Sequence, residues 1–266
     1  MASTHSRIAE RDHIKQAADL ARVSADYVFA PVNLSKVTVE EMSGVFRAHH
    51  DESIVPNDME ERCRLWQEIG NGLIQNFDGS ALQLIRQANG SAVQLVQLLY
   101  DHFPGFRDCV DWPNNADGEA SFEYLGRPQI FFLKRAQICV GDLQAALGLQ
   151  EWMDISQLTT FADYRLPQLL RHWGALIYAE EALQAAVDQK KPILAGSAME
   201  VSIRAATVVA VEELVRILSE DKPSDEESSP TMWTAVQVDW FLWQVGERLD
   251  AAQELAPHHR VRTIYY

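Results

Sequence analysis

The sequence predicts an all-α fold, and three observations support this prediction. Apolar residues recur at helical spacing along most of the chain. Only one short stretch, residues 121–132, alternates apolar and polar residues as strands do, so we expect at most one small β-hairpin. The length of 266 residues, 47% of them hydrophobic and with no internal repeat, suits a single helical domain with a sizeable core.

The helical pattern can be followed from one end of the chain to the other. It predicts helices over residues 11–23, 39–50, 58–77, 91–103, 132–148, 197–218 and 231–252. Residues 103–118, "FPGFRDCVDWPNNADG", have the composition of a long loop, and residues 219–230 are acidic and rich in proline and serine. A further helix is expected after "LTTFADYRLP", where Pro167 suits a first helical turn.

Charge and cysteine content limit the classes of function. The net charge of −15 disfavours duplex nucleic acid as a ligand, because neutralising phosphates usually requires a basic face, but it leaves a small ligand possible. Cys63, Cys109 and Cys139 form no metal-binding spacing and suggest reduced thiols. We expect no metal site, since adjacent histidines such as those of "HHDE", residues 49–52, rarely face one ion. No stretch resembles a secretory signal or a membrane span, so a cytoplasmic location is expected.

Asp163 is the first candidate for a functional residue. Because Pro167 disfavours helical geometry at Leu166, Asp163 should lie at or just before a helix N-terminus, where the helix dipole favours negative charge. Two interpretations stay open. The carboxylate could be an N-cap, as most aspartates at such positions are, or it could face a ligand. Arg165 could bind an anion or be a structural partner.

Asp239 is the second candidate, in "VQVDWFLWQV". A helix that is apolar on nearly all sides is usually buried, and a buried carboxylate needs a partner or a raised pKa. The structural interpretation is an ion pair with an arginine. The functional interpretation is ligand recognition, in which Trp240 and Trp243 beside the acid would suit a flat, hydrogen-bonding base.

Lys134 and Arg135 form a basic pair at the start of an otherwise apolar helix. The helix dipole does not favour cations there, which points to an anionic partner, although a surface position would also explain the pair. The C-terminal segment "HHRVRTIYY", residues 258–266, is expected to dock on the body of the protein.

Several segments together resemble one known family. "FPGFRD", "FLKRAQICVGDL", "FADYRLPQLLRHWGAL", "EVSIRAATVVAVEEL", "VDWFLW" and "HHRVRTIYY" occur in the order seen in the queuosine salvage proteins, also called queuosine 5′-phosphate N-glycosylase/hydrolase. The resemblance covers residues 24–266. It implies an all-helical fold related to the helix-hairpin-helix DNA glycosylases and hydrolysis of queuosine 5′-monophosphate, which releases queuine for reuse in transfer RNA modification.

The resemblance also implies a set of site residues. It suggests no metal and no organic cofactor, a small nucleotide as substrate, Asp163 as the catalytic carboxylate, and Lys134 as a further active-site residue. We also expect a monomeric protein. We add Arg165, Asp239, Trp240 and Trp243 as candidate substrate-binding residues from their positions in the sequence. The substrate phosphate would need a cation such as Lys134 or Arg165.

One departure from the family pattern bears on activity. Members usually carry an N-terminal aromatic segment of the form Asn-Phe-x-Phe-Trp, and residues 1–23, expected to be a divergent helix, do not match it. The lead hypothesis is an active nucleotide hydrolase, and because this segment is missing we expect its activity to be weaker than that of a full-length relative. The alternatives are a degenerate homologue that binds a nucleotide or a partner with little or no turnover, and a DNA glycosylase, which the charge disfavours.

Overall fold

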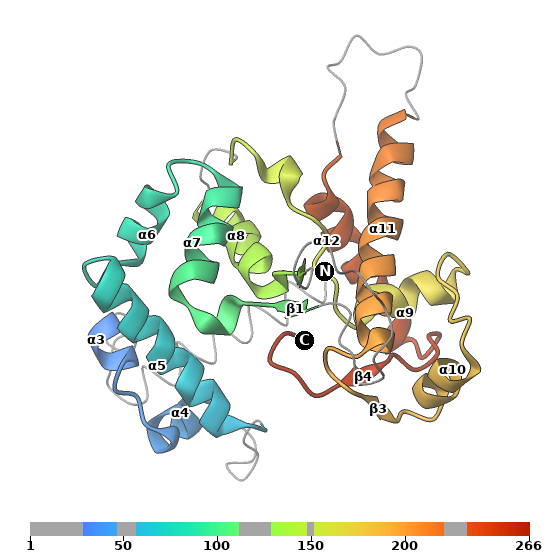
Figure 1. The fold of residues 1–266 in the computed structure, drawn as a ribbon, viewed down its shortest axis with the longest axis horizontal. Coiled ribbons are helices and arrows are strands. Elements are labelled where there is room, and N and C mark those ends of the chain that lie inside the picture. The colour runs from blue at the N-terminus through green and yellow to red at the C-terminus, as the bar shows by residue number, and fades with distance from the viewer. Residues whose placement is uncertain (1–28, 47–56, 112–128, 148–151, 221–232) are drawn as a thin grey trace, which may run out of the picture. The chain divides into compact units, whose positions relative to one another are not determined.

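The computed structural model describes residues 29–46, 57–111, 129–147, 152–220 and 233–266. It is mainly helical in these ranges, as Figure 1 shows, so the predicted all-α class is confirmed. The expected N-terminal helix over residues 11–23 lies outside the described residues. The helices are α3 (Pro31–Leu34), α4 (Val39–Phe46), α5 (Met59–Asn76), α6 (Ala81–Gln87), α7 (Ala92–His102), α8 (Lys134–Leu147), α9 (Arg165–His172), α10 (Glu181–Asp188), α11 (Ala198–Glu220) and α12 (Ala235–Ala251). Single 3-10 turns occur at Pro104–Phe106 and Ile155–Gln157.

The chain divides into two compact units. The first comprises residues 1–90 and 97–105, and the second comprises residues 91–96 and 106–266. In the first unit α3 and α4 pack on α5. Gly70 of α5 allows this approach, because a Cβ atom there would collide with the backbone of Ser35 at the end of α3. Phe77 and Phe103 stack with ring centroids 6.0 Å apart and help to form the core of this unit.

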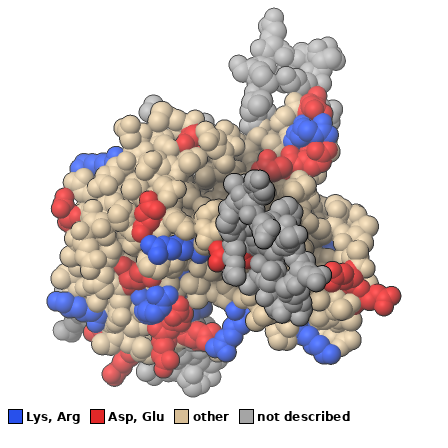
Figure 2. Space-filling view, in the orientation of Figure 1, with Lys and Arg blue, Asp and Glu red and all other residues tan. Residues whose placement is uncertain are grey.

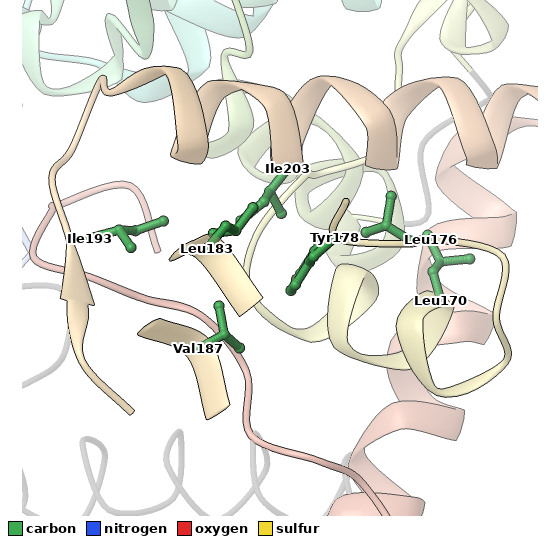
Figure 3. Close-up of a cluster of buried hydrophobic side chains, with 7 residues drawn as sticks. All are labelled: Leu170, Leu176, Tyr178, Leu183, Val187, Ile193 and Ile203. Atoms are coloured by element: carbon green, nitrogen blue, oxygen red, sulfur yellow. The ribbon is translucent and has the colours of Figure 1, made fainter. Parts of the chain in front are cut away.

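The second unit is built on α9, α11 and α12, which pack on one another. One cluster of buried side chains lies among these helices: Leu166, Leu169, Val211, Ala235, Val238 and Leu242. A second cluster lies where α10 and the chain around it cover α11. Figure 3 shows Ile203 of α11 pointing toward Leu183 of α10, next to Tyr178. α9 contributes Leu166 and Leu169 to the first cluster and Leu170 to the second, so the helix is held between two parts of the core.

Two short strand pairs accompany the helices. β1 (Cys109–Asp111) pairs antiparallel with β2 (Gln129–Phe131), with Val110 opposite Ile130. The predicted strand signal is confirmed at β2, but its partner β1 lies in the segment expected to be a loop. β3 (Pro192–Ile193) pairs in parallel with β4 (Arg260–Val261), a contact that the sequence did not predict. This second pair attaches the C-terminal segment to the body, as expected, and Figure 1 shows β3 and β4 side by side near α10.

No helix in the described ranges is both long enough and apolar enough to cross a membrane. On the surface of these residues that Figure 2 shows, Lys and Arg side chains are interspersed with Asp and Glu, and no continuous basic stripe is visible on that face.

Candidate active site

Asp163 lies just before α9, as predicted, with Tyr164 between it and the first helical residue, Arg165. Its Oδ1 atom accepts hydrogen bonds from the backbone N–H of Arg165, at 2.8 Å, and of Leu166, at 3.4 Å. These are two of the N–H groups that a helix leaves without a partner at its start. One oxygen of Asp163 therefore has the capping role that the structural interpretation assigned to it. The side chain is buried, with 7% of the residue exposed.

The second oxygen of Asp163 faces Lys134, the first residue of α8. Lys134 Nζ lies 3.8 Å from Asp163 Oδ2, and each side chain is only 10% exposed. The anionic partner that the sequence indicated for Lys134 is thus a carboxylate of the protein itself. Because 3.8 Å is longer than a hydrogen bond, the ammonium group keeps donors for a further oxygen atom. Burial lowers the pKa of Lys134, and the charge of Asp163 opposes that shift.

Asp239, on α12, is held by the chain that precedes Asp163. Its Oδ2 atom accepts hydrogen bonds from the hydroxyl group of Thr160, at 2.5 Å, and from the backbone N–H of Phe161, at 2.8 Å. Among the described residues Asp239 pairs with no arginine, and the hydrogen-bond donors that it contacts are uncharged, so the structure does not support the interpretation of an ion pair with an arginine. Burial raises the pKa of Asp239 to about 6, although both hydrogen bonds lower it.

Asp163, Lys134 and Asp239 form one electrostatic cluster. The charge of Asp163 raises the pKa of Asp239 and the charge of Lys134 lowers it, while both carboxylates act to raise the pKa of Lys134. Two acids and one ammonium group, all buried, give this cluster a net negative charge when both carboxylates are ionised. Such an arrangement can stabilise a positive charge that develops on a bound molecule.

The two tryptophans near Asp239 occupy different environments. A Cβ atom added to Gly141 of α8 would lie 3.2 Å from Cζ2 of Trp240, so the half-buried Trp240 indole packs against α8 beside Asp239. Trp243 packs instead on the buried cluster among α9, α11 and α12. The structure thus places Trp240 against α8, the helix that begins at Lys134, and gives Trp243 a place in the core.

Arg165 makes structural contacts in the second unit. Its guanidinium group donates to Glu247 at 2.7 Å, to Asp250 at 3.0 Å and to Gln168 at 2.6 Å. These partners join the first turn of α9 to α12, and Gly246 of α12 contacts the aliphatic part of the Arg165 side chain. The structure therefore supports the interpretation of Arg165 as a structural partner more than that of an anion-binding residue.

The sequence interpretation missed a second buried polar cluster, around Arg204 of α11. Arg204 forms a two-pronged ion pair with Asp108, with N–O distances of 2.8 and 2.5 Å, and lies 3.4 Å from Glu200. The hydroxyl group of Tyr266 donates to Glu200 at 2.8 Å. Arg204 is a charged residue within the apolar run "SIRAATVV", which was a detectable signal, whereas Asp108 had none.

His259 extends this cluster into the C-terminal segment. Its Nε2 atom lies 3.2 Å from the hydroxyl oxygen of Tyr266. Because that hydroxyl group donates its hydrogen to Glu200, Nε2 of His259 must carry the hydrogen of the neutral ring. Burial lowers the pKa of His259 to about 3. The tail expected to dock therefore docks through aromatic side chains.

No group of three or more His, Cys, Asp or Glu side chains among the described residues could hold a metal ion. The "HHDE" run, at residues 49–52, lies outside them.

The fold and this cluster define the class: an all-α protein with a buried acid–lysine site. The model of the queuosine salvage protein family matches residues 12–266, and the chain belongs to this family. Three curated proteins that it resembles carry the name queuosine 5′-phosphate N-glycosylase/hydrolase. That of Sphaerobacter thermophilus is 39% identical over 236 residues, which cover 88% of this chain and 64% of the relative. That of Dictyostelium discoideum is 37% identical over 260 residues, which cover 97% of this chain and 72% of the relative. That of Mus musculus is 36% identical over 233 residues, which cover 86% of this chain and 64% of the relative.

The chain thus spans about two thirds of the length of these relatives. The residues expected to differ from the family's aromatic N-terminal segment, 1–23, lie outside the described ranges.

Proposed function

We propose that this protein hydrolyses the N-glycosidic bond of queuosine 5′-phosphate and releases queuine. The observation that carries the proposal is the ion pair of Asp163 and Lys134, which is buried at the start of two helices in a chain of this family. The names of the relatives supply the substrate.

The chemistry of the bond favours an acid at this position. Hydrolysis of a nucleoside builds positive charge on the ribose, and a fixed carboxylate stabilises that charge. A 7-deazaguanine base has no N7 lone pair to protonate, so less of the barrier can be removed at the leaving group. Asp163 is well suited to this role, because its Oδ1 atom is fixed by backbone N–H groups of α9 and its Oδ2 atom faces Lys134.

In the reaction the bond between C1′ and the base nitrogen breaks, and its electron pair leaves with the base. The oxygen of water then bonds to C1′ and loses a proton, and the base takes up a proton at the nitrogen that was bonded to C1′, so the products are queuine and ribose 5-phosphate. Asp239, whose pKa of about 6 leaves it mainly ionised at neutral pH, can accept a hydrogen bond from the base or the water. Trp240 beside it offers a flat surface for the base.

We assign the substrate phosphate to Lys134 and not to Arg165. Lys134 keeps donors beside Asp163, whereas the guanidinium group of Arg165 is engaged by two carboxylates and an amide. A free nucleotide fits this small buried set of charges better than duplex DNA, which a net charge of −15 would repel.

The test is direct. The purified chain is incubated with queuosine 5′-phosphate, and free queuine is measured by mass spectrometry. The proposal is supported if the wild-type protein releases queuine and the Asp163→Asn variant does not. Tight nucleotide binding without release would instead favour a binding protein, and a salt-dependent shift of labelled duplex DNA would favour a DNA glycosylase.

A further inference from the structure

Asp108 holds the start of α8, where Lys134 lies. Its backbone oxygen accepts hydrogen bonds from the N–H groups of Phe132, at 2.9 Å, and Leu133, at 3.0 Å. Its carboxylate accepts one from the N–H of Lys134, at 3.1 Å. Leu133 has a φ of 49°, an unfavourable conformation for a branched side chain, so the chain enters α8 along a constrained path. A single residue thus fixes three successive N–H groups up to Lys134.

Arg204 connects this residue to the chain that carries Asp163. Its two terminal nitrogens bind the carboxylate of Asp108, and its Nε atom donates to the backbone oxygen of Ala162, at 3.1 Å. Ala162 immediately precedes Asp163. One planar guanidinium group therefore touches the residue that holds Lys134 and the residue before Asp163, and these segments come from different parts of the sequence.

Arg204 is itself held on several sides. Its guanidinium carbon lies 4.0 Å from the centre of the Phe132 ring and 5.4 Å from that of the Tyr266 ring. Glu200, one turn earlier on α11, lies 3.4 Å away and also accepts the hydroxyl group of Tyr266. A side chain with this many partners has little freedom to move.

A buried ion pair is weak evidence for stability, because removing two charges from water costs about as much as their attraction returns. Asp108 and Arg204 are only 2% and 3% exposed. What distinguishes this pair is which atoms it joins: the backbone at Lys134 and the backbone beside Asp163.

We propose that Asp108 and Arg204 are positioning residues, whose ion pair sets the separation between the charges of Lys134 and Asp163. The effect on turnover rests on the proposed function, whereas the effect on geometry does not.

The first variant is Arg204→Lys. Lysine keeps the positive charge but cannot contact both oxygens of Asp108 and the Ala162 oxygen together, because it lacks the planar fork. The matched control is Arg216→Lys on the same helix, where Arg216 is exposed and pairs with Glu213 and Glu220.

The second variant, Asp108→Asn, changes the other end of the pair and keeps the backbone contacts. Its matched control is Asp154→Asn. Asp154 also holds a helix start from a distance, since it accepts hydrogen bonds from Ser91 and from the N–H of Ala92 at the start of α7. Asp154 is not connected to Lys134 or Asp163 by any of these bonds.

For queuine release we expect kcat to fall about 10- to 100-fold in both variants, since small misplacements of reacting groups have effects of this order. KM should change less than about threefold, and both controls should keep wild-type kcat. In a double-mutant cycle, Arg204→Lys should cost far less when Asp163→Asn is already present, because a positioning residue acts through the residue it positions. Full additivity would show a general loss of structure and overturn the proposal.

Crystal structures of the two variants measure the geometry without any assay. We expect the separation of Lys134 Nζ and Asp163 Oδ2 to change from 3.8 Å. An unchanged separation in both variants would overturn the inference, even if the wild-type chain releases queuine. If the wild-type chain releases no queuine, the proposed function is wrong. The crystal structures alone then show whether Asp108 and Arg204 position Lys134 and Asp163.

Discussion

The carboxylate of Asp239 accepts a 2.5 Å hydrogen bond from the hydroxyl group of Thr160, which lies 79 positions earlier in the chain. This bond joins α12 to the extended segment that leads into Asp163. It also stabilises the charged form of an acid whose pKa burial raises. The orientation of Asp239 and its pKa are therefore both influenced by the same bond.

Thr160→Val should shift the pH dependence of turnover. Loss of the hydrogen bond removes a contribution that lowers the pKa of Asp239, so that pKa rises above about 6. If ionised Asp239 is required, the acid limb of the kcat profile moves to higher pH, and activity at pH 6 falls several-fold relative to pH 8. The control is Thr207→Val, whose buried hydroxyl group donates within α11 to Ile203. An unchanged acid limb would show that Asp239 need not be ionised.

Asp163→Asn should remove most of the turnover and leave the fold intact. An asparagine oxygen can still accept the N–H groups of Arg165 and Leu166, because Asn caps helices about as well as Asp. The lost charge should reduce kcat about 100- to 1,000-fold, the scale of other electrostatic deletions. The measurement is queuine release together with thermal unfolding. Asp188→Asn, which removes an exposed partner of Arg171, is the control. A rate near that of the wild type would exclude Asp163 as the stabilising acid.

Lys134→Met tests the assignment of the phosphate. Methionine keeps the length of the side chain and removes its charge, so kcat/KM should fall at least tenfold more for queuosine 5′-phosphate than for unphosphorylated queuosine. Arg135→Met, at the next position and over the ring of Phe106, should affect both substrates alike. Equal losses for both substrates in Lys134→Met would place Lys134 at the sugar or the base.

His259 should make the protein less stable in acid. Its pKa is lowered from 6.5 to about 3, so between these values the unfolded chain binds a proton that the folded chain does not. The stability contributed by neutral His259 is complete above pH 6.5 and is lost as the pH falls toward 3, at about 1.4 kcal/mol per pH unit.

His259→Phe should remove this part of the slope. The free energy of unfolding is measured by urea titration between pH 6.5 and 4 for both proteins, and the two slopes are subtracted, which cancels the opposite contribution of Asp239. His172→Phe, at the exposed end of α9, should keep the wild-type slope. Equal slopes in wild type and His259→Phe would mean that His259 is protonated in the folded state.

Gly246→Ala should destabilise the second unit. The new Cβ atom would lie 2.8 and 2.9 Å from two carbon atoms of Arg165, which cannot easily move because Glu247 and Asp250 hold its guanidinium group. We expect a loss of about 1–3 kcal/mol in the free energy of unfolding, typical of overpacking. Gly44→Ala in α4, where nothing lies within 4 Å, should be neutral or stabilising. No loss in Gly246→Ala would show that Arg165 is free to shift.

The parts of the site that could be predicted depend on local sequence. Pro167 indicated a helix start, and the structure places Asp163 two residues before the first residue of α9. The apolar surroundings of Asp239 indicated burial, and the side chain is 4% exposed. In both cases neighbours along the chain determine the environment.

The parts that could not be predicted depend on residues far apart in the sequence. Nothing near Asp108 indicates that it pairs with Arg204, 96 positions away. The α12 pattern showed that Trp240 and Trp243 lie in an apolar helix, but only the packing of α8, α9 and α11 decides which of them lies against α8 and which in the core. β1 was missed because three residues of strand need a partner before they can be recognised.

These contacts join residues that lie far apart in the sequence, and this has a consequence for folding. Each of the bonds from Thr160 to Asp239 and from Arg204 to Asp108 closes a long loop of chain, and such contacts form only after the entropy of that closure has been overcome. The helices can form from local interactions, but Asp239 and Arg204 reach these partners only after α12 and α11 have docked. During refolding, helical signal should therefore return before the proposed release of queuine, and recovery of that release would mark the docking of α11 and α12.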